Sequence, residues 1–336
     1  MKSPRVAGAP APIAAFSYIA GMDAPASAPV SAYVPQRLAR SLHLPLRGLS
    51  CHAWLWGDPA QADARTPPLV LMHGWMDVGA SFQFVVDALA RLEGERRCVI
   101  AADWRGFGGS TSGGADCFWF PDYLGDLDAL LDALVPGQRV DLAGHSMGGN
   151  VVMSYAGVRP GRIRRLVNLE GFGMPSTTPD QAPDRLARWL DELKTPQPLR
   201  SYASLGEVAE RLRKNNPRLS PDKALWLAGH WSEEREDGRR HILGDPAHKR
   251  VNPMLYRAEE VLASWRRIEA PVLWIEGDET DVARFWGDRY PRAEFEGRLA
   301  HVPGVERVVL KACGHMLHHD QPEALAEALL AFLRKE

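Results

Sequence analysis

Ser146 stands between a histidine and a methionine in the stretch AGHSMGGN, which covers residues 143–150. Small residues crowd around this serine, namely Gly144, Gly148 and Gly149. Such crowding indicates that the backbone bends sharply at Ser146 and that another group approaches it closely. A serine hydroxyl held out at such a bend could act as a nucleophile.

The residues on either side of the bend predict a strand before Ser146 and a helix after it. The run QRVDLAG fits a buried strand, and GNVVMSYAG has the apolar spacing of a helix. Strand, G-x-S-x-G and helix in this order are typical of a nucleophile elbow, where the helix N-terminus favours developing negative charge. Because a serine hydroxyl is a poor nucleophile at neutral pH, it needs a neighbouring base. His315, in the turn after the last predicted strand, is the candidate for that base.

Strand and helix patterns alternate along most of the chain. Short apolar runs predict buried strands, and segments with apolar residues three or four positions apart predict helices between them. The patterns predict a hairpin at residues 43–57, a strand at 68–74, and helices at 81–92 and 123–135. This alternation indicates an α/β protein with a mostly parallel sheet that is flanked by helices.

The alternation stops after Gly173. Residues 174–265 contain helical stretches, many arginines and no strand-like run, which predicts a helical cap inserted over the C-terminal edge of the sheet. The α/β pattern then resumes, so the core is expected at residues 41–173 and 266–336. Four tryptophans of the cap suggest an apolar acyl or aromatic substrate: Trp189, Trp226, Trp231 and Trp265.

Composition and charge limit the classes of partner and site that the protein can have. The 336 residues are 45% hydrophobic and 24% charged, which is ordinary for a globular protein. A formal net charge of −2 gives no electrostatic reason to expect a nucleic acid or an anionic membrane as partner. No apolar run reaches the roughly 18 residues of a membrane span. The four cysteines have no CxxC or Cys/His spacing, so no metal site is expected.

The N-terminal segment is rich in alanine and proline. Its basic start and short apolar patch faintly match a secretory signal, but the patch is short and flanked by prolines. We therefore expect residues 1–40 to be a poorly ordered tail and the protein to be cytoplasmic, with a processed targeting segment as the alternative.

Four motifs together resemble the alpha/beta-hydrolase-fold serine hydrolases, over roughly residues 45–336. They occur in the order and approximate spacing of that family, and the first is most similar to the serine-hydrolase-like and haloperoxidase-like esterase group. The motifs are HGWMD (73–77), DWRGFGGS (103–110), GHSMGG (144–149) and CGHMLHHDQPEAL (313–325). The resemblance implies a catalytic triad of Ser146, His315 and an acid, with no cofactor.

The resemblance also assigns the groups around the nucleophile. The backbone N–H groups of Trp75 and Met147 would form the oxyanion hole, and His73 would shape that pocket. His318 and His319 follow the predicted base so closely that they are expected in the wall of the site or on the surface.

The acid of the triad is the member that the motifs leave open. In the family it commonly stands three residues after the glycine of a strand such as VLWIEG, where this chain has Thr280. A loop one residue longer would bring Asp281 into place, and we favour Asp281 over Asp278. The alternative is Glu170, at the strand end from which haloalkane dehalogenases supply their acid. Glu170 ends an apolar strand, where an unpaired carboxylate would be costly.

The serine at the elbow distinguishes among the reactions that enzymes of this fold catalyse. Epoxide hydrolases and haloalkane dehalogenases of the family use aspartate there, so Ser146 argues against both. The expected activity is hydrolysis of a small-molecule carboxylic ester through an acyl-serine, as in a carboxylesterase. Carbon–carbon bond hydrolases, amidases and thioesterases share the triad and stay open, as does a ligand-binding receptor with slow turnover. Nothing in the sequence predicts an oligomeric state.

Overall fold

An eight-stranded sheet forms the centre of the protein, for which the computed structural model describes residues 31–195, 197–281 and 286–335. The strands follow the spatial order β1-β2-β4-β3-β5-β6-β10-β11, and from β4 to β11 all neighbours are parallel. The strands are β1 (Arg40–Leu46), β2 (Leu49–Trp56), β3 (Leu69–Met72), β4 (Val99–Ala102), β5 (Val140–His145), β6 (Ile163–Leu169), β10 (Val272–Gly277) and β11 (Val305–Leu310). This topology confirms the predicted α/β fold with a mostly parallel sheet.

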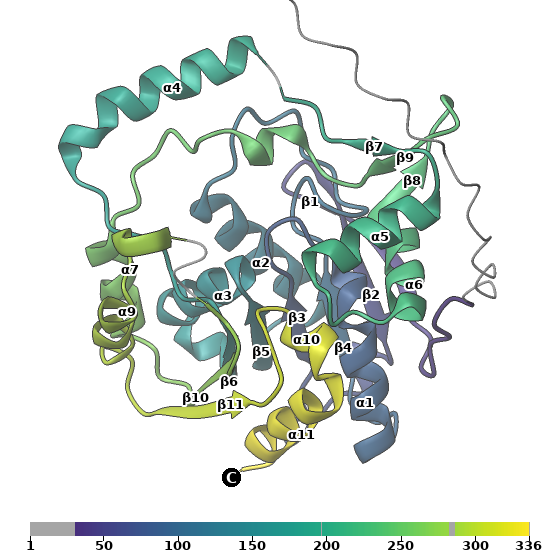
Figure 1. Ribbon diagram of the computed structural model, residues 1–336. Coiled ribbons are helices and arrows are strands. Elements are labelled where there is room, and N and C mark those ends of the chain that lie inside the picture. Colours follow the sequence, from purple (N-terminus) through teal and green to yellow (C-terminus); the bar gives the residue numbers. More distant parts are fainter. Residues whose placement is uncertain (1–30, 196, 282–285, 336) are drawn as a thin grey trace, which may run out of the picture. The chain divides into compact units, whose positions relative to one another are not determined.

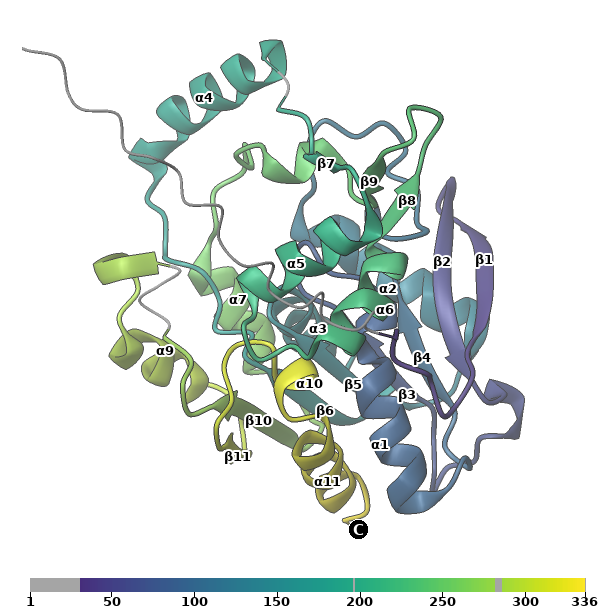
Figure 2. The same ribbon diagram turned by 45° about the vertical axis from the view of Figure 1, so that its right-hand side comes forward.

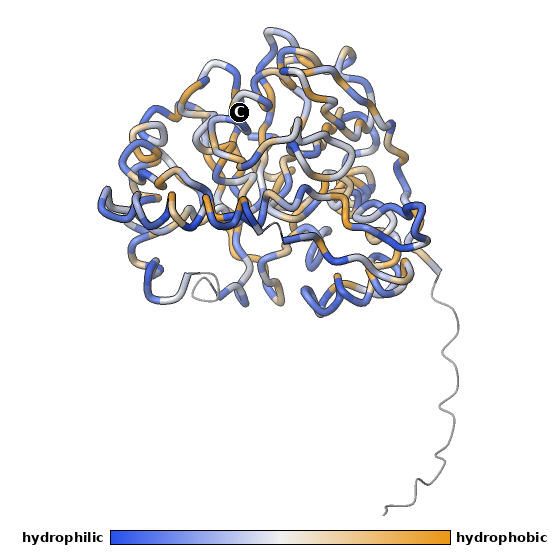
Figure 3. Tube along the Cα trace, turned by 90° about the horizontal axis from the view of Figure 1, so that it is seen from above, coloured by the Kyte–Doolittle hydropathy of each residue, from blue (hydrophilic) through white to orange (hydrophobic). Residues whose placement is uncertain are grey.

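Helices cover both faces of the sheet, as Figures 1 and 2 show. Leu69 and Leu71 of β3 pack in one apolar cluster with α1 and α11, whereas Val70 and Met72 pack on the opposite side with α2 and α3. The alternation follows from the strand geometry, in which successive side chains point to opposite faces. The helices are α1 (Gln83–Glu93), α2 (Phe120–Leu134), α3 (Met147–Val158), α9 (Arg292–Leu299), α10 (Leu317–Asp320) and α11 (Pro322–Leu333). Figure 3 shows apolar residues concentrated toward the interior and polar ones on the outer turns.

The segment between β6 and β10 is only partly helical. It contains the helices α4 (Ala182–Lys194), α5 (Leu205–Asn215), α6 (Pro221–Trp231) and α7 (Ala258–Trp265). It also contains three short strands, β7 (Ser201–Tyr202), β8 (Ser232–Glu234) and β9 (Arg240–Ile242), in the order β7-β9-β8. The expectation of a cap without strands was therefore wrong, because strands of two or three residues leave no apolar alternation to read.

The ends of this inserted segment differ in their packing. Helix α4 has no buried residue and stands apart from the sheet in Figures 1 and 2. Helix α7 packs on α3, and its Trp265 is fully buried in the main apolar cluster. The last part of the segment 174–265 thus belongs structurally to the core rather than to a cap.

The folded part of the chain begins earlier than residue 41. Three groups hydrogen-bond to the buried Asp87 of α1: the Tyr33 hydroxyl at 2.6 Å, the Gln36 N–H at 3.1 Å and the Arg37 N–H at 2.8 Å. These bonds, which the sequence pattern does not reveal, fix residues of the expected tail, whereas residues 1–30 lie outside the described part. No helix among the described residues is long and apolar enough to cross a membrane.

Candidate active site

Ser146 is the first residue after β5 and precedes α3, as the elbow motif predicts. Its φ of 52° lies in the left-handed region, which costs free energy for any residue but glycine. The surrounding backbone enforces this geometry: a Cβ added to Gly144 would lie 2.4 Å from the Gly148 carbonyl oxygen, and one on Gly148 would lie 2.3 Å from that of Met72. Strand and helix are therefore pressed together around the serine, which points out at the helix N-terminus.

Strand register brings Ser146 and Glu170 to matching positions. His145 of β5 pairs with Leu169 of β6, so Ser146 and Glu170 are each the first residue after that pair. Both residues have a positive φ, which is 56° at Glu170. Ser146 and the Glu170 carboxylate thus emerge side by side at the carboxyl edge of the parallel sheet, where ligands bind in open α/β folds.

His315 lies in the loop between β11 and α10 and contacts this carboxylate. Its Nδ1–H donates a hydrogen bond of 2.6 Å to Oε2 of Glu170. The other carboxylate oxygen of Glu170 accepts a bond of 2.7 Å from the N–H of Gly277. The fully buried side chain of Glu170 therefore has an N–H donor for each oxygen, which offsets the cost of burying its charge.

The structure thus corrects the preference for Asp281 over Glu170 as the acid beside His315. Asp281 is an exposed residue after β10, next to residues 282–285 that lie outside the described part. Asp278 serves the loop in another way, because its Oδ1 accepts a bond of 3.2 Å from the Cys313 N–H. The cost of an unpaired carboxylate at the end of β6 was the sequence signal for Glu170. The length of the loop after β10 favours Asp281 at the level of the sequence, because neither the strand register nor the φ of Glu170 can be read from a sequence.

Two further side chains hold the histidine loop. Oδ2 of Asp320 accepts a hydrogen bond of 2.9 Å from the Gly314 N–H. The Nε2–H of His145 donates a bond of 2.7 Å to the carbonyl oxygen of His315. The residue before Ser146 is thereby bonded to the residue predicted as base, a role that the sequence analysis did not predict.

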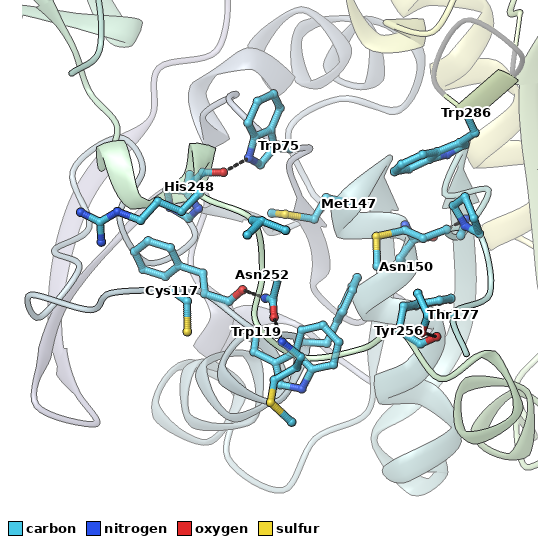
Figure 4. A pocket seen from close by; sticks show the side chains of 18 of the residues that line it. Trp75, Cys117, Trp119, Met147, Asn150, Thr177, His248, Asn252, Tyr256 and Trp286 are labelled. Atoms are coloured by element: carbon cyan, nitrogen blue, oxygen red, sulfur yellow. Dashed lines mark hydrogen bonds between the residues drawn. The ribbon is translucent and has the colours of Figure 1, made fainter. Parts of the chain in front are cut away.

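A cavity of about 1240 Å³ opens at this edge of the sheet. Ser146, Glu170 and His315 all line it, together with Trp75 and Met147. Figure 4 shows Trp75, Trp119, Tyr256 and other lining side chains around the cavity. The structure therefore brings Ser146, His315, Glu170 and the two predicted oxyanion-hole residues to one cavity, which Asp281 does not line.

The loop that carries Trp75 lies against Ser146. A Cβ added to Gly74 would stand 2.9 Å from Nδ1 of His145 and 3.2 Å from the Cβ of Ser146, so a larger residue there would force these neighbours to shift. Met147 opens α3, and the first N–H groups of a helix have no acceptor within it. The Trp75 indole lies in the cavity wall and donates a bond of 3.3 Å to the His248 carbonyl oxygen (Figure 4).

The cavity is rich in aromatic side chains, but they are not the tryptophans expected from the cap. Trp226 and Trp231 pack against the apolar cluster of α5 and α6, and Trp265 belongs to the main core. Trp189 is not one of the described residues that line the cavity either. The aromatic walls come from Trp75, Phe118, Trp119, Phe120, Tyr123, Phe172, Tyr256 and Trp286.

The histidines that follow His315 are buried, which corrects their expected place in the site wall or on the surface. The Nε2 of His318 lies 3.3 Å from an Asp77 carboxylate oxygen and 3.2 Å from the Ser81 hydroxyl. Burial lowers the pKa of His319 to about 3 and holds the pKa of His145 well below its usual value. The imidazoles of His319 and His145 are therefore neutral parts of the packing behind the site.

Asp77, His145 and His318 also bring three ligand-type atoms within 4.8 Å of one another. Such a trio could hold a metal ion. The Asp77 carboxylate, however, already accepts a bond of 2.9 Å from Ser81 and lies next to His318 Nε2. Hydrogen-bond contacts thus join Asp77, Ser81 and His318, whereas Nδ1 of His145 has no hydrogen-bond partner among the described residues.

Comparison with known proteins places this architecture in a family. The family model described as "alpha/beta hydrolase fold" matches residues 67–322. A serine hydrolase-like protein of Danio rerio is 27% identical over 321 residues, which cover 90% of each chain. A 3-hydroxybutyrate-oligomer hydrolase of Cupriavidus necator is 28% identical over 75% of this chain and 83% of its own.

Solved structures agree at the level of the fold. A thioesterase domain from the curacin biosynthetic pathway superposes with a TM-score of 0.74 at 24% identity, covering 87% of this chain and 99% of that domain. The chain therefore belongs to the alpha/beta hydrolase fold family, as its four motifs had indicated.

Proposed function

We propose that the protein is a serine hydrolase that cleaves carboxylic esters through an acyl-serine on Ser146. His315 is the general base and Glu170 is the acid of the triad. The observation that carries this proposal is the 2.6 Å hydrogen bond from His315 Nδ1 to Glu170, beside a cavity that Ser146 also lines. The 3-hydroxybutyrate-oligomer hydrolase among the relatives has a name that denotes cleavage of an ester oligomer, which supports ester chemistry here.

The acylation step follows from the roles of these residues. The Ser146 hydroxyl oxygen attacks the ester carbonyl carbon while Nε2 of His315 takes the hydroxyl proton. The Glu170 carboxylate holds the imidazole through Nδ1 and stabilises the imidazolium that forms. The N–H groups of Trp75 and Met147 donate to the negative carbonyl oxygen of the tetrahedral intermediate. When that intermediate collapses, His315 returns the proton to the departing alkoxide, which leaves as an alcohol.

Deacylation repeats the sequence with water. His315 takes a proton from a water molecule, whose oxygen attacks the acyl carbon, and the second tetrahedral intermediate uses the same two N–H donors. Collapse releases the carboxylic acid, and the proton on His315 returns to the Ser146 oxygen. The enzyme needs no co-reactant other than water for this cycle.

The proposal is tested with short 4-nitrophenyl esters and the Ser146→Ala variant. We expect multiple turnovers by the wild type and, in the variant, only the residual acceleration of about 10³–10⁴ over water that persists without a triad. A fluorophosphonate probe should label Ser146 alone, as read by peptide mapping. Labelling of another residue, or unchanged turnover in the variant, would refute the mechanism. A single burst without turnover would favour the receptor alternative.

A further inference from the structure

Four basic side chains line the cavity. They are Arg185 and Arg188 of α4, together with Lys249 and Arg250. Two hydrogen bonds join the segments that carry them: Arg185 Nη1 donates to the Asn252 carbonyl oxygen at 3.1 Å, and the Val251 N–H donates to Glu192 at 2.6 Å. Four cations from two distant parts of the sequence are thus brought to one place.

Two of these charges are already compensated and two are not. Arg188 pairs with Glu192 at 2.7 Å, and Arg250 pairs with Asp116 at 3.3 Å. Within the described part of the chain, Arg185 hydrogen-bonds only to the neutral Asn252 carbonyl, and Lys249 forms no ion pair. Cations of one sign that line a concave site attract an anion more strongly than isolated surface cations do.

The charges of the other lining residues do not cancel this excess. Arg289 adds a further cation to the cavity wall, and the described acids that line it are Glu170, which is held by His315, and Asp184. The whole chain, by contrast, carries a formal net charge of −2. The positive charge of the cavity is therefore a local feature and not a consequence of a basic protein.

The orientation of α4 agrees with this distribution of charge. Asp184, Arg185 and Arg188 turn toward the cavity, whereas Leu186 and Leu190 do not line it and are 44% and 50% exposed. A helix that served a purely apolar substrate would present its apolar stripe to the cavity. This helix presents its charged face instead.

From these observations we infer that the substrate carries an anionic group, a carboxylate or a phosphate, at a distance from the scissile carbonyl. Arg185 and Lys249 bind that group, because a guanidinium matches the two oxygens of such an anion and an ammonium adds a point charge. The aromatic walls take the apolar part of the substrate between the anion and the carbonyl at Ser146. This inference rests on the proposed esterase function and specifies its substrate class.

The test compares esters that differ in one charge. Mono-4-nitrophenyl suberate has a carboxylate at the far end of its acyl chain, and 4-nitrophenyl octanoate is its neutral counterpart. We expect the wild type to prefer the anionic ester. In Arg185→Gln and Lys249→Gln, kcat/KM for the anionic ester should fall about tenfold, the change that ~1.4 kcal/mol produces, while the value for octanoate holds. Raising the salt concentration should weaken the preference, since ions screen the attraction.

Arg200→Gln is the matched control. Arg200 is an exposed arginine of the same inserted segment that stacks on Tyr202 and does not line the cavity, so its loss should change neither rate. Melting temperatures near that of the wild type would show that the variants fold.

A second arm locates the anion within the substrate. The octanoate ester of 4-hydroxybenzoate carries the charge on the leaving group, and the octanoate ester of methyl 4-hydroxybenzoate is its neutral counterpart. A preference for the anion in either arm that Arg185→Gln removes supports the inference and tells on which side the anion lies. Equal rates for charged and neutral esters in both arms would overturn the inference while leaving the esterase function intact. Absence of turnover for every ester would overturn both.

Discussion

Glu170 shows how a single residue acquires a role that its sequence neighbours only suggest. Its carboxylate is fully buried at the end of an apolar strand, and each oxygen accepts one N–H bond, from Gly277 and from His315. The sequence predicts that such a carboxylate needs a partner, but not which one. The positive φ at Glu170 and the strand register, both products of the folded backbone, direct the side chain to His315.

Converting Glu170 to glutamine should lower kcat by about three to four orders of magnitude, because the imidazole loses the charge that orients it and stabilises its cation. Asp281→Asn, assayed on the same small ester, should lower kcat far less, because water screens the interaction between an exposed charge and the imidazole. Steady-state rates of both variants, with circular dichroism as a check on folding, decide between the two carboxylates. A dead Asp281→Asn with an active Glu170→Gln would reverse the assignment.

At the scale of elements, the predicted strands and helices of the core are present because their periodicity is strong. The hairpin predicted at 43–57 appears as β1 and β2, joined by Arg47 and Gly48, both with the positive φ that a two-residue hairpin turn requires. The inserted segment was harder to predict. Its short strands have no readable period, and an aromatic residue in a sequence does not reveal whether it faces a cavity or a helix neighbour.

The aromatic wall offers a prediction at this scale. Trp119→Ala enlarges the cavity, so the preferred acyl chain should become longer or bulkier, measured as kcat/KM across a series of 4-nitrophenyl esters. Trp226→Ala is the control, because Trp226 packs against Phe84 and His230 outside the cavity. That variant should lose about 3 kcal/mol of stability and keep its chain-length profile. An unchanged profile in Trp119→Ala would mean that the acyl chain binds elsewhere.

For the whole molecule, buried histidines link stability to pH. Neither ring nitrogen of His319 has a hydrogen-bond partner among the described residues, and burial lowers its pKa to about 3, against about 6.5 in an unfolded chain. The unfolded state therefore binds more protons between these values. The stability contributed by the neutral ring is complete above about pH 6.5 and is lost as the pH falls toward 3.

We expect the free energy of unfolding to decline between pH 7 and pH 5 by about 2 kcal/mol more in the wild type than in His319→Leu, whose side chain cannot be protonated. Urea titrations at several pH values measure this difference. His301→Gln removes an exposed histidine and should follow the wild-type curve. Parallel curves for the wild type and His319→Leu would show that this ring is not a source of acid sensitivity.

The hairpin of β8 and β9 divides the proposed catalytic residues along the chain. Its exposed tip, residues 235–238, follows Ser146 and Glu170 in the chain and precedes His315. Exposed tips tolerate chain breaks better than other places. A chain cut there yields one fragment with the nucleophile and the acid and another with the base. Attached to two interacting proteins, such fragments would regain hydrolysis only on reassembly, so the chain order of this site lends itself to a complementation reporter.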